Sequence, residues 1–283
     1  MAELVQAARP MGGSAWRRIA HPSANVALAQ FVIVAAVLLF WQAAAGPRGA
    51  LLDELFVGRP SLIFSQTVTW LLDGTLLSNA WVTIQEALLG FALGAFIGIS
   101  AGLVLGATRI GQVLIAPLVF VAYSVPRLAL APLFVLWFGI GMESKIALIT
   151  TIVFFYVFFN AYEGARQVDE DLTAVCRIMK ASRWQILTKV TIPSAMVWVA
   201  VGLKISVPHA FAGAIVGEII AGRMGLGTLM SKSSHALDAN GLFSAALVST
   251  LLAIALNAIV SRGVGVGLRW RQEAAAGGAT ELL

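Results

Sequence analysis

The chain has 283 residues, of which 59% are hydrophobic and only 12% are charged. Because a soluble domain carries about 25% charged residues, this composition indicates a membrane protein. The single cysteine, Cys176, excludes an internal disulfide, and the three histidines are too scattered along the sequence to form a metal site. The sequence has no G-x-x-x-x-G-K-[ST] motif, so we expect this chain to bind neither a metal nor ATP.

The N-terminal segment 1–25 is polar and contains Arg17 and Arg18, and an apolar run follows at 26–45. The arginine pair is compatible with a twin-arginine export signal. However, the apolar run is too long for the core of a signal peptide, and at 1.5 Å per residue it covers the ~30 Å of a bilayer. We therefore favour an uncleaved first span that follows a cytoplasmic segment, 1–25.

Segment 46–79 contains more acidic than basic residues, which favours the outer side of the membrane. Within it, residues 61–72 alternate apolar and polar side chains at helical spacing and include Trp70. This pattern predicts a helix that lies flat at the membrane interface.

The second predicted span, 80–107, has a glycine at every fourth position. These glycines are Gly90, Gly94, Gly98, Gly102 and Gly106. Small residues at this spacing let another helix approach closely within lipid, so we predict that they are helix-packing residues. Four residues turn a helix by about 400°, so the row drifts by about 40° per step and favours a crossing neighbour over a parallel one. The sequence leaves open whether that neighbour belongs to the same chain or to a second copy.

A short basic loop at 108–112 returns the chain to the inner side, and the apolar region 115–140 is interrupted by three prolines. Broken helices at membrane depth line a cavity or pack within protein, because their freed carbonyl groups need partners. Arg127 is the one charged residue of this region. It is a candidate for the substrate pathway, and the alternative is an arginine at a helix end that extends outward to the interface.

Three further apolar runs are predicted spans, at 146–161, 194–220 and 241–260. Lys204 and Glu218, in the fifth span, are two more candidates for the substrate pathway. The alternatives are a lysine that reaches the inner interface and an ordinary carboxylate at a helix end.

Basic residues near both ends of the chain place both termini in the cytoplasm, which requires an even number of crossings. Counting 115–140 as one crossing gives six spans, a membrane domain at 26–262 and a cytoplasmic tail at 263–283. The glycine-rich segment 221–240 is then an outer loop able to receive a partner. We thus predict an all-α, polytopic membrane protein.

The longest polar interval, 161–193, lies between the fourth and fifth spans. Its apolar residues at helical spacing are Leu172, Val175, Cys176 and Met179. Asp169 is the N-cap candidate of this first short helix. Ser182, with Gln185 three residues later, forms a capping-box pattern that starts a second helix. We expect a bend at Ala181–Ser182 and the end of the second helix at Pro193, because the residue before a proline disfavours helical backbone.

The charges of this interval are mixed, which argues against a simple lipid-binding patch. Trp184 among them is typical of a surface that docks a protein, and the alternative is an amphipathic but merely solvated loop.

The interval 162–193 resembles the cytoplasmic loop of ATP-binding-cassette (ABC) importer permeases. The signature of that loop is E-A-A, three residues, G, nine residues, I-x-L-P. Aligned on Pro193, Ala174 stands in place of the glutamate and Lys180 in place of the glycine. The sequence around the loop, including residues 132–149 and 225–227, resembles that of the nitrate, sulfonate and taurine branch of this family.

This resemblance implies a type I ABC importer permease fold and a transport subunit without enzyme activity of its own. It implies import of a small anion such as nitrate, sulfonate or taurine. The implied partners are a second copy of the chain, a cytoplasmic ATPase subunit that holds ATP and Mg²⁺, and an extracytoplasmic solute-binding protein, all at a bacterial inner membrane. The implied ATPase-coupling residues are Asp171, Ala174, Arg177, Lys180, Ser182, Arg183, Trp184, Gln185 and Pro193. The alternatives are a secondary transporter driven by an ion gradient and an ABC permease for a heterocyclic vitamin precursor.

Overall fold

The computed structural model describes residues 24–46 and 52–267. The predicted cytoplasmic segment 1–25 and tail 263–283 therefore lie largely outside the described residues. The long helices are α2 (Ala24–Ala44), α5 (Thr75–Gly106), α8 (Met142–Arg166), α11 (Ile192–Ala221) and α13 (Ala239–Gly267). The shorter ones are α3 (Glu54–Val57), α4 (Pro60–Leu72), α6 (Ala116–Tyr123), α7 (Ala131–Phe138), α9 (Glu170–Ile178), α10 (Arg183–Ile186) and α12 (Leu226–His235).

Three irregular segments join some of these helices: the π-helical η1 (Gly111–Ile115) and η3 (Leu187–Thr191), and the 3₁₀ turn η2 (Arg127–Leu130). A short parallel pair, β1 (Ala45–Gly46) and β2 (Leu52–Asp53), precedes α3. The chain is thus nearly all helical, as the sequence predicts.

Within the described residues, five helices are long and apolar enough to cross a membrane, or six if the bent pair α6–α7 is one span. This agrees with the predicted six. The helices extend past the predicted apolar runs because they include polar end residues; α8, for example, begins at Met142 and includes Glu143 and Lys145.

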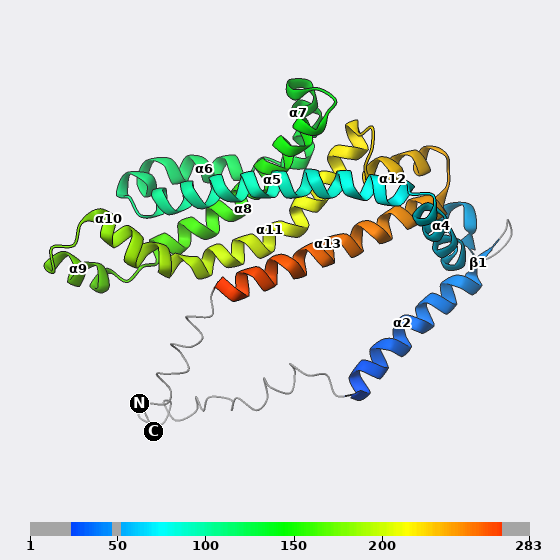
Figure 1. Ribbon diagram of the computed structural model, residues 1–283, viewed down its shortest axis with the longest axis horizontal. Coiled ribbons are helices and arrows are strands. Elements are labelled where there is room, and N and C mark those ends of the chain that lie inside the picture. The colour runs from blue at the N-terminus through cyan, green and yellow to red at the C-terminus, as the bar shows by residue number, and fades with distance from the viewer. Residues whose placement is uncertain (1–23, 47–51, 268–283) are drawn as a thin grey trace, which may run out of the picture.

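The long helices α5, α8, α11 and α13 run beside one another, with α9 and α10 at one end of the bundle (Figure 1). At the opposite end lie α12 and α4, the latter transverse to the long helices (Figure 1). The loop that carries α9 and α10 is therefore separated from α12 by the full length of the bundle.

The five glycines of α5 are all buried, and they pack against α8 of the same chain. A Cβ atom built on each glycine would lie 2.5 to 3.2 Å from a backbone carbonyl oxygen of α8. In the order of the glycines, these oxygens belong to Ile146, Thr150, Phe154, Phe158 and Tyr162. The partner is therefore internal, which answers the question that the sequence leaves open.

The contact is not confined to one point, because residues of α8 lie against all five glycines of the row. Both contact rows advance by four residues in the same chain direction, and each drifts by about 40° per step around its own axis. The rows can stay in contact only if the two helices are inclined to each other and wrap around one another. At a rise of 1.5 Å per residue, this backbone-to-backbone contact is about 24 Å long. A carbonyl oxygen close to each glycine Cα permits a weak Cα–H···O contact at each step.

Replacing Gly94 with alanine tests this contact. Its Cβ would lie 2.6 Å from the Thr150 carbonyl oxygen and 2.8 Å from the Val153 Cβ, neither of which can move without shifting α8. We expect the Gly94→Ala variant to be less stable by about 1–3 kcal/mol, measured as a lower midpoint of thermal unfolding in lipid nanodiscs. Gly263→Ala is the matched control, since a Cβ there meets nothing within 4 Å. Equal losses in the two variants would contradict the packing role.

Candidate functional site

The predicted proline-broken region forms a sharp bend at Arg127. Helices α6 and α7 meet at 76°, and the residues between them include Pro126, whose backbone is extended, and the turn η2. The helix α6 ends at Tyr123, and the Arg127 guanidinium Nη2 donates to the freed Tyr123 carbonyl oxygen. The bend is thus stabilised by the one charged side chain of the region.

Arg127 packs its guanidinium group against aromatic rings of α6 and α8. Its guanidinium carbon lies 4.3 Å from the centre of the Tyr123 ring and 4.7 Å from that of Phe155, the geometry of cation–π contacts. Phe155 is near the middle of α8, far from both ends of that span. The arginine therefore lies beside the middle of α8 and not beside either of its ends.

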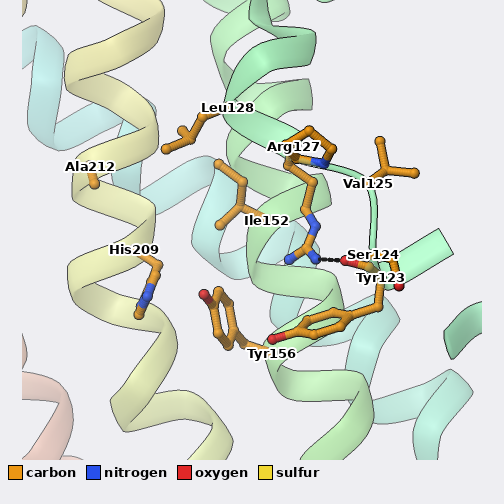
Figure 2. A pocket seen from close by; sticks show the side chains of 10 residues that line it. Tyr123, Ser124, Val125, Arg127, Leu128, Ile152, Tyr156, His209 and Ala212 are labelled. Carbon is orange, nitrogen blue, oxygen red and sulfur yellow. Dashed lines mark hydrogen bonds between the residues drawn. The ribbon is translucent and has the colours of Figure 1, made fainter. Parts of the chain in front are cut away.

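A cavity of about 350 Å³ opens beside this arginine, between the α6–α7 bend, α8 and α11 (Figure 2). We call it the Arg127 pocket. Its lining consists of Tyr123, Ser124, Val125, Pro126, Arg127, Leu128, Ile152, Tyr156, His209 and Ala212. The Tyr156 and His209 rings lie face to face at a tilt, 4.2 Å apart, and Tyr123 is perpendicular to Tyr156 at 6.4 Å. The pocket thus combines one cation with three aromatic rings.

Sequence reasoning missed Tyr123, Tyr156 and His209 as pocket residues. An aromatic residue in an apolar helix carries no signal that separates a pocket wall from lipid-facing or core packing. His209 lies one residue after Pro208, the proline inside α11, which was the only available hint.

The other two candidates of the substrate pathway lie elsewhere. Lys204 is exposed on α11, more than one helical turn before His209, and does not line the Arg127 pocket. Glu218 is only 1% exposed and does not line the Arg127 pocket.

Glu218 instead holds α12 against the bundle. Its two carboxylate oxygens accept hydrogen bonds from the Thr83 hydroxyl and the Gly227 amide, both at 2.6 Å. The amides of Gly225 and Leu226 donate to Asn79 Oδ1 at 2.7 Å and Thr83 Oγ1 at 2.9 Å. The start of α12 is therefore capped by side chains of α5 and α11, which satisfy amides that a helix leaves free at its N-terminus.

A buried ion pair lies next to this cap. Lys145, 5% exposed, donates to Glu86 Oε1 at 2.7 Å, and Glu86 is 1% exposed. The second Glu86 oxygen has no hydrogen-bond partner among the described residues. Lys145 comes from α8 and Glu86 from α5, so the pair joins the two helices just before the first contact of the glycine row, at Gly90 and Ile146.

The polar interval forms the two predicted short helices, α9 and α10. The Asp169 side chain accepts from the Asp171 amide at 2.8 Å, as expected of an N-cap. Ser182 and Gln185 form both halves of the predicted capping box, since Gln185 N donates to Ser182 Oγ and Ser182 N donates to Gln185 Oε1.

The apolar side chains of this loop are strongly exposed. Ile178 is 81% exposed, Met179 77% and Trp184 71%, and Leu172 and Val175 are exposed as well. We call these five residues the loop patch. Large apolar side chains gathered on a projecting loop are typical of a surface that binds a protein.

Comparisons with known proteins identify the family. Residues 90–266, more than half of the chain, match the family described as binding-protein-dependent transport system inner membrane component. The chain belongs to this family of permeases. The permease is 32% identical to the riboflavin transport system permease protein RibX of Chloroflexus aurantiacus, over 84% of this chain and 87% of that protein. It is 28% identical to the putative aliphatic sulfonates transport permease protein SsuC of Bacillus subtilis, over 85% of this chain and 86% of that protein.

Among solved structures, the MetNI methionine ABC transporter in an inward facing conformation contains a similar chain, with a TM-score of 0.59 and 20% identity. The match covers 70% of the permease and 97% of that chain, and at this identity it shows the fold alone. The permease thus has the predicted type I ABC importer permease fold. It is a multi-pass membrane transport subunit and not an ATP-hydrolysing enzyme.

The predicted coupling residues of the permease share one location, with one exception. Eight of them are exposed and belong to α9, α10 and the turn between them: Asp171, Ala174, Arg177, Lys180, Ser182, Arg183, Trp184 and Gln185. Pro193 lies apart from them, in the first turn of α11.

We expected the second short helix to end at Pro193, but the helical backbone continues through this residue. The chain continues from Arg183 through η3 into α11, and Ile192 before the proline has helical angles, φ −60° and ψ −52°. The wider π-helical turn of η3 accommodates the proline, which lacks an amide hydrogen and crowds the preceding turn. The loop is therefore directly continuous with the fifth predicted span.

The bend between α9 and α10 also differs from the prediction. Lys180, at the position of the family's glycine, has φ +58°, in the left-handed region that glycine adopts without strain. The reversal thus begins at Lys180 itself, one residue before the predicted Ala181–Ser182.

We expect Lys180→Gly to stabilise this turn, because a lysine in the left-handed region costs roughly 1–2 kcal/mol. Hydrogen exchange of the permease in nanodiscs should show slower exchange of the Ala181 amide, which donates to the Cys176 carbonyl. Ala174→Gly, inside α9, is the matched control and should speed exchange, since glycine costs a helix interior about 1 kcal/mol. Faster exchange in Lys180→Gly would refute the left-handed strain.

We expect Lys145→Met to destabilise the permease by about 3–5 kcal/mol, because it leaves the Glu86 carboxylate buried without its partner. The double variant Lys145→Met, Glu86→Leu should recover most of this loss, since it removes both charges. Thermal unfolding in nanodiscs measures both. A double variant no more stable than the single one would show that Lys145 acts through something other than the ion pair.

Proposed function

We propose that this permease is the membrane subunit of an ATP-driven importer, and that α9 and α10 dock into a separate ATPase subunit on the cytoplasmic side. The observation that carries the proposal is the loop patch, because exposed apolar side chains in water are costly unless a partner covers them. The capping of α9 by Asp169 and of α10 by Ser182 gives this surface a defined shape before any partner binds.

The same proposal places both termini in the cytoplasm and α12 on the outer side, where a solute-binding protein delivers the substrate. It is supported by the separation of α9 and α10 from α12 by the length of the bundle (Figure 1). A second copy of the permease completes the translocation path, and the membrane is a bacterial inner membrane. ATP and Mg²⁺ belong to the ATPase subunits.

We further propose that the imported solute is anionic. The observation that supports this is Arg127, which lines a cavity beside the middle of α8 and forms no ion pair with a described residue. A cation left without a counter-charge at membrane depth is costly, and an anionic solute would compensate it during passage. The relative named for aliphatic sulfonates is in keeping with an anion.

The aromatic walls of the same pocket favour one alternative, a heterocyclic vitamin or vitamin precursor, and a relative is named for riboflavin. The gradient-driven alternative has less support. Its candidate ion-binding carboxylates, Glu86 and Glu218, are bound to Lys145, Thr83 and the α12 cap, and neither lines the Arg127 pocket.

Replacing Trp184 with glutamate tests the docking surface. We expect the variant to insert and fold normally but to lose the ATPase subunit during purification from the native membrane, because a charge replaces the largest apolar side chain of the loop patch. Quantitative mass spectrometry of the tagged permease measures the ATPase that co-purifies.

Trp184→Phe should retain the ATPase, and so should Gln167→Glu, which adds the same charge at an exposed site outside the patch. An intact complex with normal transport in Trp184→Glu would refute the coupling assignment.

A further inference from the structure

We propose that the Arg127 pocket is a binding site within the membrane for an organic anion that carries a flat ring. It selects such a solute over bare inorganic oxyanions and over zwitterions. This inference rests on the proposed function, and it assigns to the permease itself a selectivity in addition to that of any solute-binding protein.

The anionic group is assigned by Arg127. Its Nη2 is used by the Tyr123 carbonyl, but its Nε is buried and has no hydrogen-bond partner among the described residues. The guanidinium is held in place by the Tyr123 and Phe155 rings. A planar donor held in this way is suited to a sulfonate or carboxylate, which accepts charge-assisted hydrogen bonds.

The ring is assigned by the walls of the pocket. Tyr156 of α8 and His209 of α11 form a tilted, stacked pair of rings in the wall of the pocket, and Ile152, Leu128 and Ala212 supply apolar surface beside that pair (Figure 2). The volume of about 350 Å³ is in the range of small-molecule sites. A bare inorganic oxyanion fills the space of a few water molecules, at about 30 Å³ each, and would leave these walls against water.

His209 adds a polar group with a fixed orientation. Its Nδ1 lies 2.8 Å from the Ile205 carbonyl oxygen, and because a carbonyl only accepts, Nδ1 carries the hydrogen. The Nε2 atom remains for a polar substituent of the ring. The pocket therefore offers donors at Arg127 and one orienting nitrogen across from it.

The exclusion of zwitterions follows from what the lining lacks. None of the residues that line the pocket is an aspartate or glutamate. A bound ammonium group would lose its hydration without gaining a carboxylate, which costs several kcal/mol in a low-dielectric site. An aminosulfonate is therefore expected to bind less tightly than a sulfonate of similar size that has no amine.

The test uses the permease–ATPase complex in lipid nanodiscs without the solute-binding protein, so that only the membrane site is probed. Isothermal titration calorimetry with benzenesulfonate, methanesulfonate, nitrate and taurine gives the four dissociation constants. We expect benzenesulfonate to bind at least tenfold more tightly than each of the others. Equal affinities for benzenesulfonate and for nitrate or taurine would overturn the inference.

Variants assign the binding to this pocket. Arg127→Gln should weaken benzenesulfonate binding tenfold or more, as expected for the loss of a charged hydrogen bond of about 1.5 kcal/mol or more. Tyr156→Leu should weaken it about two- to tenfold, and Tyr156→Phe should restore it because the ring is kept. Arg109→Gln and Phe96→Leu make the same chemical changes at exposed positions outside the pocket and should have no effect.

The two proposals fail in different ways. A complex that retains the ATPase and hydrolyses ATP but binds none of the four probes, or binds them unchanged in Arg127→Gln, overturns the pocket assignment and leaves the importer function standing. Failure of any ATPase to co-purify overturns the importer function, and the same titration on the permease alone still decides whether the pocket binds.

Discussion

The close approach of α5 and α8 determines the arrangement of the whole membrane domain. Five glycines bring the two backbones together along their length, and α8 is also flanked by glycines of α11. A Cβ at Gly202 would lie 2.8 Å from Asn160, and one at Gly213 would lie 2.8 Å from Ile152. Helix α8 thus lies between two helices that approach it closely at their glycines. Because close packing in lipid replaces the hydrophobic effect as the attractive force, this fit determines where Phe155 and Tyr156 stand.

Lys145 and Arg127 are cations in very different surroundings. Lys145 is buried and paired with Glu86 beside the α12 cap, so its charge contributes to the packing of α8 against α5. Arg127 is stacked on aromatic rings and faces a cavity with no carboxylate in its lining. The paired site is closed, and the unpaired site is open to a solute. This contrast explains why the Arg127 pocket, and not the Glu218 cap, is the candidate for substrate contact.

The features that local chemistry determines were predictable from the sequence: the six apolar regions, the Asp169 cap, the Ser182–Gln185 capping box and the glycine row. The partner of that row, the burial of Glu218 and the aromatic walls of the pocket were not, because they depend on residues far apart in the sequence that meet only after the helices pack. Thr83 and Glu218, 135 positions apart, share one hydrogen bond. Pro193 misled the prediction for another reason. The residue before a proline disfavours helical backbone without excluding it, and the wider π-helical turn before Ile192 makes room for the proline ring.

The continuity across Pro193 also connects the two candidate sites. From Arg183 to Ala221 the chain is helical for 39 residues, so Trp184 of the loop patch and His209 of the Arg127 pocket belong to one continuous helical segment. The opposite wall of the pocket belongs to the α6–α7 bend and to α8, which the glycine contact holds to α5. A displacement of α10 by an ATPase would therefore move His209 relative to Arg127. The exception is a displacement absorbed by η3 or by the turn at Pro208, where the helical segment departs from regular α-helix. Under the proposed function, the same helix that receives the motion of the ATPase forms one wall of the site that the motion must open.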